Sequence, residues 1–257
     1  MSAKRTLYTV APGLLGIVLL IVGVSCNKDN PVGGKNDKNT GTVKDADGNV
    51  YATMKIGNQE WMAENLRTTK YNDGTAIPLV TDSSTWGTWE NLTTPAFCYY
   101  NNTTNSDSIK KFGALYNWYA VNTGKLAPAG WHVPTDSEWD TLRNYLIANG
   151  YNYDGTTTGN KIAKSMAAKT DWEASTREGA IGNDLTKNNS SGFSALPGGS
   201  RGSDGHFYYQ SLWGRWLSAT EGDASTAWCR YLYCDCEDLN RNYSDKVCGF
   251  SLRLVRD

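Results

Sequence analysis

The sequence has little histidine, no excess of charge of either sign and no internal repeat. Two of its 257 residues are histidines, and 25 Lys and Arg stand against 26 Asp and Glu, which gives a formal net charge of −1. This balance, with no basic cluster, gives no indication of a nucleic-acid partner. The histidines do not lie at helical spacing and the carboxylates are scattered, so the sequence favours neither a zinc hydrolase nor a glycosidase.

The two histidines have different surroundings. His132 lies between Trp131 and Val133, where we expect a partly buried, hydrogen-bonded imidazole. His206 lies beside Asp204 in a glycine-rich turn, and we expect an exposed loop position there.

Phenylalanine is also scarce, with 5 residues, whereas there are 10 Trp and 15 Tyr. Aromatic side chains with a polar edge are suited to a core that borders solvated loops, and they are also suited to binding surfaces. We expect most of them to be core residues.

Long apolar runs are absent after the first 25 residues. Lys4 and Arg5 precede an uninterrupted run of apolar residues and glycine from Leu14 to Val24, and Cys26 follows a small residue. This order is that of a bacterial lipoprotein signal peptide, although such signals usually carry Leu where Gly23 stands. We predict cleavage after residue 25 and a lipid on Cys26. A single membrane-spanning anchor is the alternative, since about 18 apolar residues can suffice.

The segment from residue 26 to residue 42 is polar and rich in Gly, Asn and Lys. We therefore expect a flexible tether that lifts one domain, residues 43–257, off a membrane. The pair Lys28-Asp29 resembles the charged surface-export tag of Bacteroidetes lipoproteins. The predicted location is the outer membrane, with the domain on the cell surface or the periplasmic face.

An odd number of cysteines remains beyond the lipid-attachment residue. They are Cys98, Cys229, Cys234, Cys236 and Cys248. Because cysteines outside the cytoplasm tend to pair, we expect one or two disulfides linking residues 229–236 to Cys248 or Cys98. At least one thiol is then free, metal-bound or paired between chains, and the connectivity stays open.

The strongest local signal is the stretch from residue 128 to residue 149. Thr135 and Glu138 form a capping box, which marks a helix start. The apolar residues at helical spacing behind it are Trp139, Leu142, Tyr145 and Leu146. Asn149-Gly150 supplies the left-handed residue that ends a helix. The sequence therefore predicts a capped amphipathic helix against which the rest of the domain packs.

The rest of the domain is predicted to consist of short strands, two further short helices and long loops. We expect strands at residues 50–56, 60–63, 97–100, 216–219, 227–233 and 249–255, helices at 113–121 and 162–169, and loops at 67–96 and 101–111. This mixture predicts the α+β fold class in a single domain.

Four stretches together resemble a known family. They are GNQEWMAENLR (Gly57 to Arg67), PAGWHVPTDSEWDTL (Pro128 to Leu142), GFSALPGG (Gly192 to Gly199) and GFSLRLVRD (Gly249 to Asp257). In this order they resemble the Fibrobacter succinogenes major paralogous domain family, and with weaker blocks the resemblance covers residues 43–257. The family is common on lipoproteins of Bacteroidetes and Fibrobacteres, and the resemblance implies no particular activity.

The chain is also distantly similar to formylglycine-generating enzymes, through the P-T-x-x-E-W helix and the C-terminal G-F-x-L-R strand. That similarity implies an elaborated C-type-lectin-like fold. Those enzymes bind copper(I) with two cysteines five apart at a similar place, which here are Cys229 and Cys234, with Cys236 and Cys248 as further metal or disulfide candidates. Soft thiolates suit copper(I). Residues five apart in a regular strand, however, point to opposite faces.

A second motif matches the nucleophile elbow of hydrolases, G-x-S-x-G, at residues 198–202. The elbow needs a strand before the serine and a helix after it. The flanking residues predict turns and a strand, so we interpret the segment as a loop.

The candidates for ligand binding lie around residues 200–217. They are Arg201, Asp204, Tyr208, Tyr209, Trp213 and Trp216. Flat aromatic rings stack on sugar faces, while Asp and Arg bind hydroxyl groups or, for Asp, Ca²⁺. Core packing is the alternative for Tyr208 and Trp216. Separately, Asp107-Ser108-Ile109 in a polar loop resembles the short O-glycosylation acceptor of Bacteroidetes, with Ser108 as the modified residue.

These observations favour a non-catalytic cell-envelope lipoprotein that binds a glycan or another envelope protein through its loops. It would contact the membrane through its N-terminal lipid, and we expect no cofactor. Ca²⁺ and copper are the two metals that its residues could bind. The alternatives are a copper oxidoreductase using Cys229 and Cys234, and a structural surface protein without a discrete ligand.

Overall fold

The computed structural model describes residues 39–87 and 92–256. The predicted signal peptide, the lipid-attachment residue Cys26 and most of the predicted tether lie outside the described residues. The first strand begins at Asn39, four residues before the expected start of the domain at Val43. None of the helices in the described part of the chain is long and apolar enough to cross a membrane.

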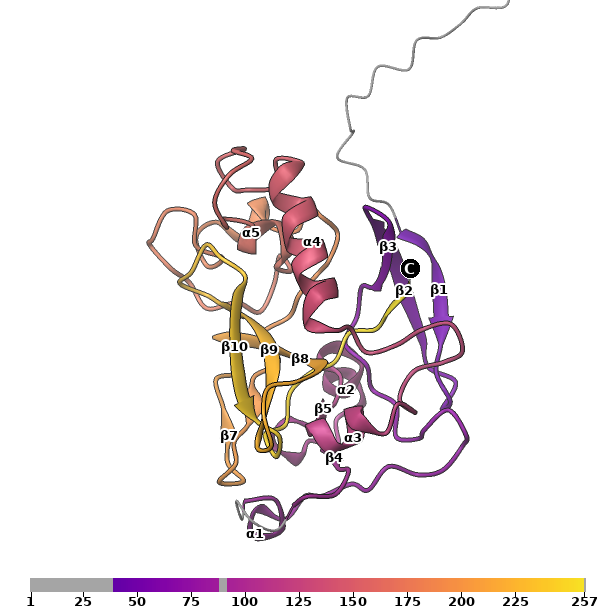
Figure 1. Cartoon of the computed structure of the whole chain (residues 1–257). Coiled ribbons are helices and arrows are strands. Elements are labelled where there is room, and N and C mark those ends of the chain that lie inside the picture. Colours follow the sequence, from indigo (N-terminus) through magenta and orange to yellow (C-terminus); the bar gives the residue numbers. More distant parts are fainter. Residues whose placement is uncertain (1–38, 88–91, 257) are drawn as a thin grey trace, which may run out of the picture. The chain divides into compact units, whose positions relative to one another are not determined.

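The first sheet joins the two ends of the described chain. Its strands are β1 (Asn39–Lys44), β2 (Val50–Ile56), β3 (Gln59–Met62) and β11 (Val255–Arg256). Their order is β1-β2-β3-β11, and all neighbours are antiparallel. Trp61 pairs with Val255, so the C-terminal segment closes on the N-terminal hairpin (Figure 1).

The second sheet has the order β10-β9-β8 and is also antiparallel. Its strands are β8 (Trp213–Glu221), β9 (Thr226–Tyr233) and β10 (Asn240–Asp245). Because side chains alternate along a strand, Trp216 and Trp213 of β8 point to opposite faces. Two further sheets each consist of a pair of two-residue strands. They are β4 (Phe97–Cys98) with β5 (Leu115–Tyr116), and β6 (Ser200–Arg201) with β7 (Phe207–Tyr208).

Helix α4 (Asp136–Ala148) contacts both sheets and lies between them (Figure 1). The predicted capping box is confirmed: Thr135 Oγ1 accepts from the Glu138 amide at 3.2 Å, and Glu138 Oε2 accepts from the Thr135 amide at 2.7 Å. Gly150 then leaves the helix with a φ of 72°. The apolar face of α4 is buried through Trp139, Leu142 and Leu146.

Four aromatic rings that are 0% exposed form the centre of the fold, and we call them the buried ring cluster. They are Trp61, Trp139, Phe193 and Trp216. The ring centroids are 4.8 Å apart for Trp61 and Trp139, and 6.4 Å apart for Trp139 and Trp216. Since these rings come from β3, α4, a loop and β8, the cluster holds both sheets to the helix.

A buried polar group lies next to this cluster. Asn65 Oδ1 accepts from Trp216 Nε1 at 3.0 Å and from Arg253 Nε at 2.9 Å, and its Nδ2 donates to the Phe112 carbonyl at 2.8 Å. Arg253 also donates to the carbonyls of Met62 and Phe193. One asparagine therefore connects four segments that are far apart in the sequence.

Several predicted elements need correction. Residues 101–111, expected as a loop, belong largely to the short 3-10 helix η1 (Tyr100–Asn102) and the helix α2 (Ser106–Phe112). Residues 113–121, expected as one helix, are divided between β5 and α3 (Trp118–Asn122). Gly113, with a φ of 77°, ends α2 where a Cβ would lie 2.6 Å from Asn65 Cβ. The close approach of Gly113 to Asn65 therefore fixes the end of α2, and this contact between distant residues cannot be read from the sequence.

Other differences are smaller. The second helix is only α5 (Ala163–Met166), the expected loop at 67–96 contains α1 (Ser83–Trp86), and η2 (Leu185–Lys187) was not expected. The expected strand at 249–255 contributes only Val255 to a strand and otherwise forms isolated bridges. β10 was missed because this edge strand is almost entirely polar and shows no alternation.

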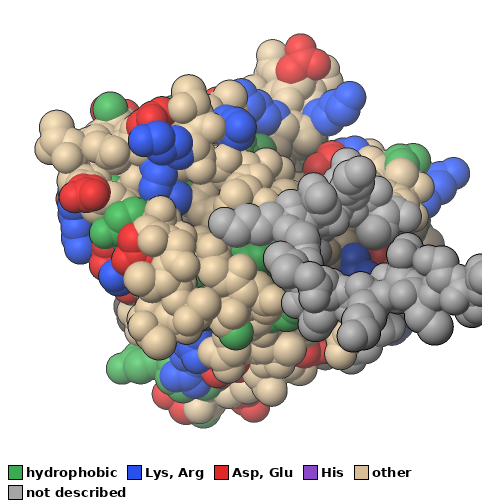
Figure 2. Space-filling view, turned by 90° about the horizontal axis from the view of Figure 1, so that it is seen from above, with side chains coloured by type: hydrophobic (Ala, Val, Ile, Leu, Met, Phe, Trp, Pro, Cys, Tyr) green, Lys and Arg blue, Asp and Glu red, His purple; other side chains and the backbone are tan. Residues whose placement is uncertain are grey.

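Charged side chains of both signs are mixed on the face of the molecule that Figure 2 shows. Lys and Arg lie among Asp and Glu there rather than in separate patches.

Candidate functional site: an aromatic surface row

A set of partly exposed aromatic rings lies on and beside the face of the β8–β9 pair opposite to Trp216. We call it the aromatic row, and it consists of Tyr208, Tyr209, Trp213, Tyr231 and Tyr233. Neighbouring centroids are 5.5 Å apart for Tyr208 and Tyr209 and 5.8 Å for Tyr209 and Trp213. Trp213 is 4.9 Å from both Tyr231 and Tyr233. The five rings thus form one unbroken series of contacts.

Strand pairing places the centre of the row. Trp213 is directly opposite Tyr233, and Arg215 is opposite Tyr231, so the four side chains share one face. The Arg215 guanidinium lies 4.5 Å from the Trp213 ring and 5.5 Å from the ring of the buried Phe250. Arg215 therefore fills the space between the row and the core, in a favourable cation–π position.

The loop before β8 displays Tyr209, which is 47% exposed. Tyr209 and Ser211 have φ values of 64° and 70°, in the left-handed region that large side chains rarely adopt. Hydrogen bonds hold this conformation: the Trp213 amide donates to the Tyr209 carbonyl at 2.9 Å, and the Ser211 amide donates to the Pro197 carbonyl at 3.1 Å. Strain of this kind is common where a loop serves a function.

The row ends at an acidic group. Asp204 accepts a hydrogen bond from the Tyr208 hydroxyl and another from the His206 amide at 3.1 Å. The Tyr208 hydrogen bond, opposed by partial desolvation, holds the pKa of Asp204 below its usual value. The carboxylate is half exposed and His206 Nδ1 lies 3.4 Å from it. A charged oxygen and an imidazole are therefore available to a ligand at this end.

Two predicted ligand-binding residues lie in the interior instead. Arg201 is 0% exposed and donates to the carbonyls of Gly205, Val80 and Thr81 at 2.9, 2.6 and 3.0 Å. Trp216 belongs to the buried ring cluster. Arg201 positions the turn that carries Asp204, and neither side chain is accessible to a ligand.

Sequence reasoning missed Tyr231, Tyr233 and Arg215. A signal was present, because the tyrosines are two apart in a predicted strand and thus share a face. What the sequence did not show was that β9 pairs with β8 in a register that places both tyrosines beside Trp213 on the same face of the sheet.

The predicted disulfides are wrong for the described residues, in which all five cysteines are free thiols. Cys98 and Cys234 lie in two different hydrophobic clusters, and a third cluster contains Cys229 with Cys248. Burial raises the pKa of the Cys229 thiol to about 11 and of the Cys98 thiol to about 12. Buried thiols of this kind behave as apolar core residues.

The same separation bears on the copper hypothesis. Cys229 belongs to the hydrophobic cluster that contains Leu217 and Phe250, whereas Cys234 belongs to the cluster that contains Leu232 and Trp216. The two sulfurs thus contribute to different clusters, which is unfavourable for joint ligation. In residues 39–87 and 92–256, no three His, Cys, Asp or Glu side chains are grouped so that they could hold a metal ion.

The remaining candidate residues are the two histidines and two serines. His132 Nε2 lies 2.5 Å from Glu138 Oε1, which confirms the hydrogen-bonded imidazole, and His206 is 71% exposed. Ser108 lies in α2 rather than in a loop, and its amide donates to Asn105 Oδ1. Ser200 begins the short strand β6 instead of lying in a loop, and a turn rather than a helix follows it.

The fold and the aromatic row define the class of this protein as a single α+β domain with short antiparallel sheets and a partly exposed aromatic surface. The chain belongs to the Fibrobacter succinogenes major domain family, whose sequence model matches residues 54–256. No match was found among curated proteins or among solved structures.

Proposed function

We propose that this protein is a non-catalytic binding module of the cell envelope that binds a glycan on its aromatic row. The observation that carries the proposal is the unbroken series of five partly exposed rings centred on Trp213. Contiguous apolar surface of this kind usually marks a binding site.

A glycan suits the row better than a protein partner does. The rings are flat, and four of the five carry a hydroxyl that can bond to sugar hydroxyls. Asp204 and His206 add polar groups at one end, whereas a typical protein interface would have an apolar centre. Binding to an envelope protein is therefore the weaker form of the proposal.

The envelope location is part of the same proposal. It is supported by the signal-like first 25 residues and by Cys26, which would carry the lipid in the outer membrane. Mass spectrometry of the mature N-terminus tests it: an acylated Cys26 is expected, and an unmodified Met1 would refute this part alone.

We also propose the C-type-lectin-like architecture, which the P-T-x-x-E-W helix and the C-terminal G-F-x-L-R segment support. An experimental structure superposed on lectin-like domains tests it. A different order of strands around α4 would refute it without affecting the aromatic row.

The test of glycan binding uses the full chain in a detergent without sugar groups, applied to a glycan array. Trp213→Ala is expected to weaken binding at least tenfold, about 1.4 kcal/mol. The matched control is Trp228→Ala, since Trp228 is also partly exposed but lies on the opposite face of β9, beside Arg241. Equal effects of the two variants would contradict the proposal, and binding to no glycan would favour a structural role.

A further inference from the structure

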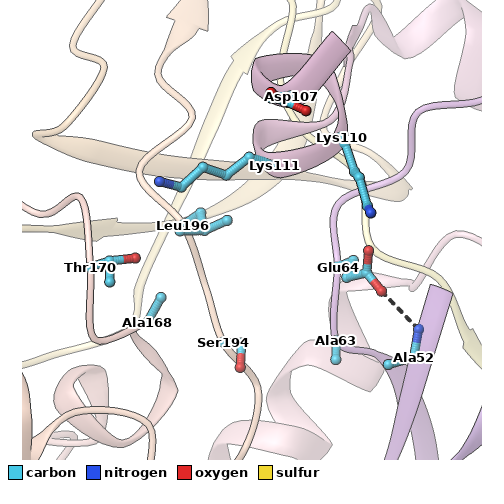
Figure 3. A pocket seen from close by; sticks show the side chains of 10 residues that line it. All are labelled: Ala52, Ala63, Glu64, Asp107, Lys110, Lys111, Ala168, Thr170, Ser194 and Leu196. Carbon is cyan, nitrogen blue, oxygen red and sulfur yellow. Dashed lines mark hydrogen bonds between the residues drawn. The ribbon is translucent and has the colours of Figure 1, made fainter.

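A cavity that none of the aromatic row residues lines lies beside α2 (Figure 3). Its volume is about 550 Å³. Small-molecule sites usually have volumes of about 300–1,000 Å³. We call it the α2 cavity.

The floor of the α2 cavity is apolar. Ala52 of β2, Ala63 after β3, Ala168 after α5 and Leu196 contribute methyl groups from four separate segments (Figure 3). Three of these four residues are alanines, and their short side chains leave the space open. A small apolar body fits against them and would remove their methyl groups from water.

Most charges around the cavity are already compensated. Glu64 Oε1 accepts from the Ala52 amide at 2.9 Å, and Glu64 Oε2 pairs with Arg67 Nη1 at 3.2 Å. On the other side, Lys111 Nζ pairs with Asp171 Oδ1 at 2.7 Å. These pairs occupy Glu64 and Lys111, so Lys110 is the remaining basic side chain of the lining.

Lys110 differs from its neighbour. Its side chain extends from α2 into the cavity, while that of Lys111 extends to the opposite side (Figure 3). Figure 3 shows Lys110 extending toward the side of the cavity where Glu64 lies, and none of the ion pairs formed within residues 39–87 and 92–256 includes Lys110. Asp107 of α2 also lines the cavity (Figure 3).

We propose that the α2 cavity binds a small carboxylate with an apolar body, such as a short acyl or aryl acid. The ligand's carboxylate pairs with the Lys110 ammonium. Its apolar body lies on the alanine floor.

Calorimetric titrations of the full chain with three probes distinguish the contribution of the ligand's charge from that of its apolar body. The probes are 3-phenylpropionate, its neutral amide 3-phenylpropanamide, and acetate. We expect saturable binding of 3-phenylpropionate, with the amide and acetate each at least tenfold weaker, because one lacks the charge and the other the apolar body. Affinity for the acid should also fall as NaCl rises from 50 to 500 mM, since the cavity is open to salt.

Two variants locate the binding. Lys110→Gln should weaken 3-phenylpropionate at least tenfold, while the control Lys55→Gln, at an exposed position of β2, should leave Kd within twofold. Ala63→Leu should abolish binding by filling the floor, with an unfolding midpoint measured to show that the fold persists.

The proposal is overturned if the acid does not bind, if the amide binds equally well, or if Lys110→Gln and Lys55→Gln behave alike. Trp213→Ala should bind 3-phenylpropionate as the unchanged chain does. Failure of the glycan proposal and failure of this one are therefore distinguishable.

Discussion

The buried ring cluster and the aromatic row are two sets of rings with nearly the same internal geometry. Centroids in the cluster are 4.8 to 6.4 Å apart, and those in the row are 4.9 to 5.8 Å apart. The cluster is 0% exposed, whereas Tyr209 in the row is 47% exposed. β8 contributes one tryptophan to each set, Trp216 to the cluster and Trp213 to the row.

The comparison shows that contacts between rings do not distinguish a core from a binding surface. What differs is the element that covers each set. Residues of α4 and of the segment around Phe193 cover one side of β8, and on the other side Arg215 separates Trp213 from the core. We therefore expect substitutions in the cluster to affect stability and substitutions in the row to affect binding.

The largest loss of stability is expected for a substitution in the buried ring cluster. Trp139→Ala should reduce the free energy of unfolding by about 4 kcal/mol, because it removes a completely buried indole and leaves a cavity. Trp139→Phe retains a ring and should lose about 1–2 kcal/mol. Urea denaturation followed by circular dichroism measures both, and equal losses would show that ring packing is not what the site requires.

The next effect concerns the polar group beside the cluster. Asn65→Ala should cost about 3 kcal/mol, because it leaves Arg253 Nε and the Trp216 indole N–H without an acceptor in the interior. The control is Asn144→Ala on the exposed side of α4, which should stay within about 0.5 kcal/mol. If both variants unfold at the same urea concentration, Asn65 does not connect the segments as described.

A smaller effect is expected in the row. Trp213→Ala should cost about 1 kcal/mol of stability, mainly through the lost contact with Arg215. Urea denaturation of Trp213→Ala beside Trp139→Ala tests the comparison directly. A loss in Trp213→Ala as large as that in Trp139→Ala would place Trp213 in the core and remove the distinction between the two sets.

The smallest effect is a dependence on pH at the start of α4. Partial burial would raise the pKa of Glu138, but hydrogen bonds from Thr135 and His132 outweigh it and hold that pKa below its usual value near 4.5. For Asp136, hydrogen bonds from Arg241 and Arg230 likewise outweigh burial and lower the pKa below 3.8. Groups with a lowered pKa in the folded state add stability above the unfolded value, and this stability is lost as pH falls through the folded value.

Stability should therefore decrease between pH 5 and pH 3, and Glu138→Gln should show a shallower decrease. Urea midpoints at pH 6, 5, 4 and 3 measure it. Parallel curves for Glu138→Gln and the unchanged chain would exclude Glu138 as a source of the effect.

Local signals accounted for part of this structure. The helix after Thr135, its cap and its glycine exit were predicted correctly because each depends on residues within one or two turns. The strands β2, β8 and β9 were also predicted, with small errors in their ends. α2 was missed because its residues are mostly polar, so its only signals were the Asn105 cap and Gly113.

The candidate site was predicted in part. Asp204, Tyr208, Tyr209 and Trp213 do lie at the surface, while Arg201 and Trp216 are buried. Alternation along a strand shows that Trp213 and Trp216 face opposite ways, but it does not show which face another element will cover.

The sequence by itself determined the family, through its collinear motif blocks. It also determined the α+β class and the capped helix, because capping and apolar spacing act over a few residues. Only the tertiary structure decided which aromatic rings become core and which become surface. The physical reason is that burial depends on segments far away in the chain: Trp216 is covered by Asn65 and by α4, and Trp213 meets Tyr231 and Tyr233 only after β8 and β9 pair.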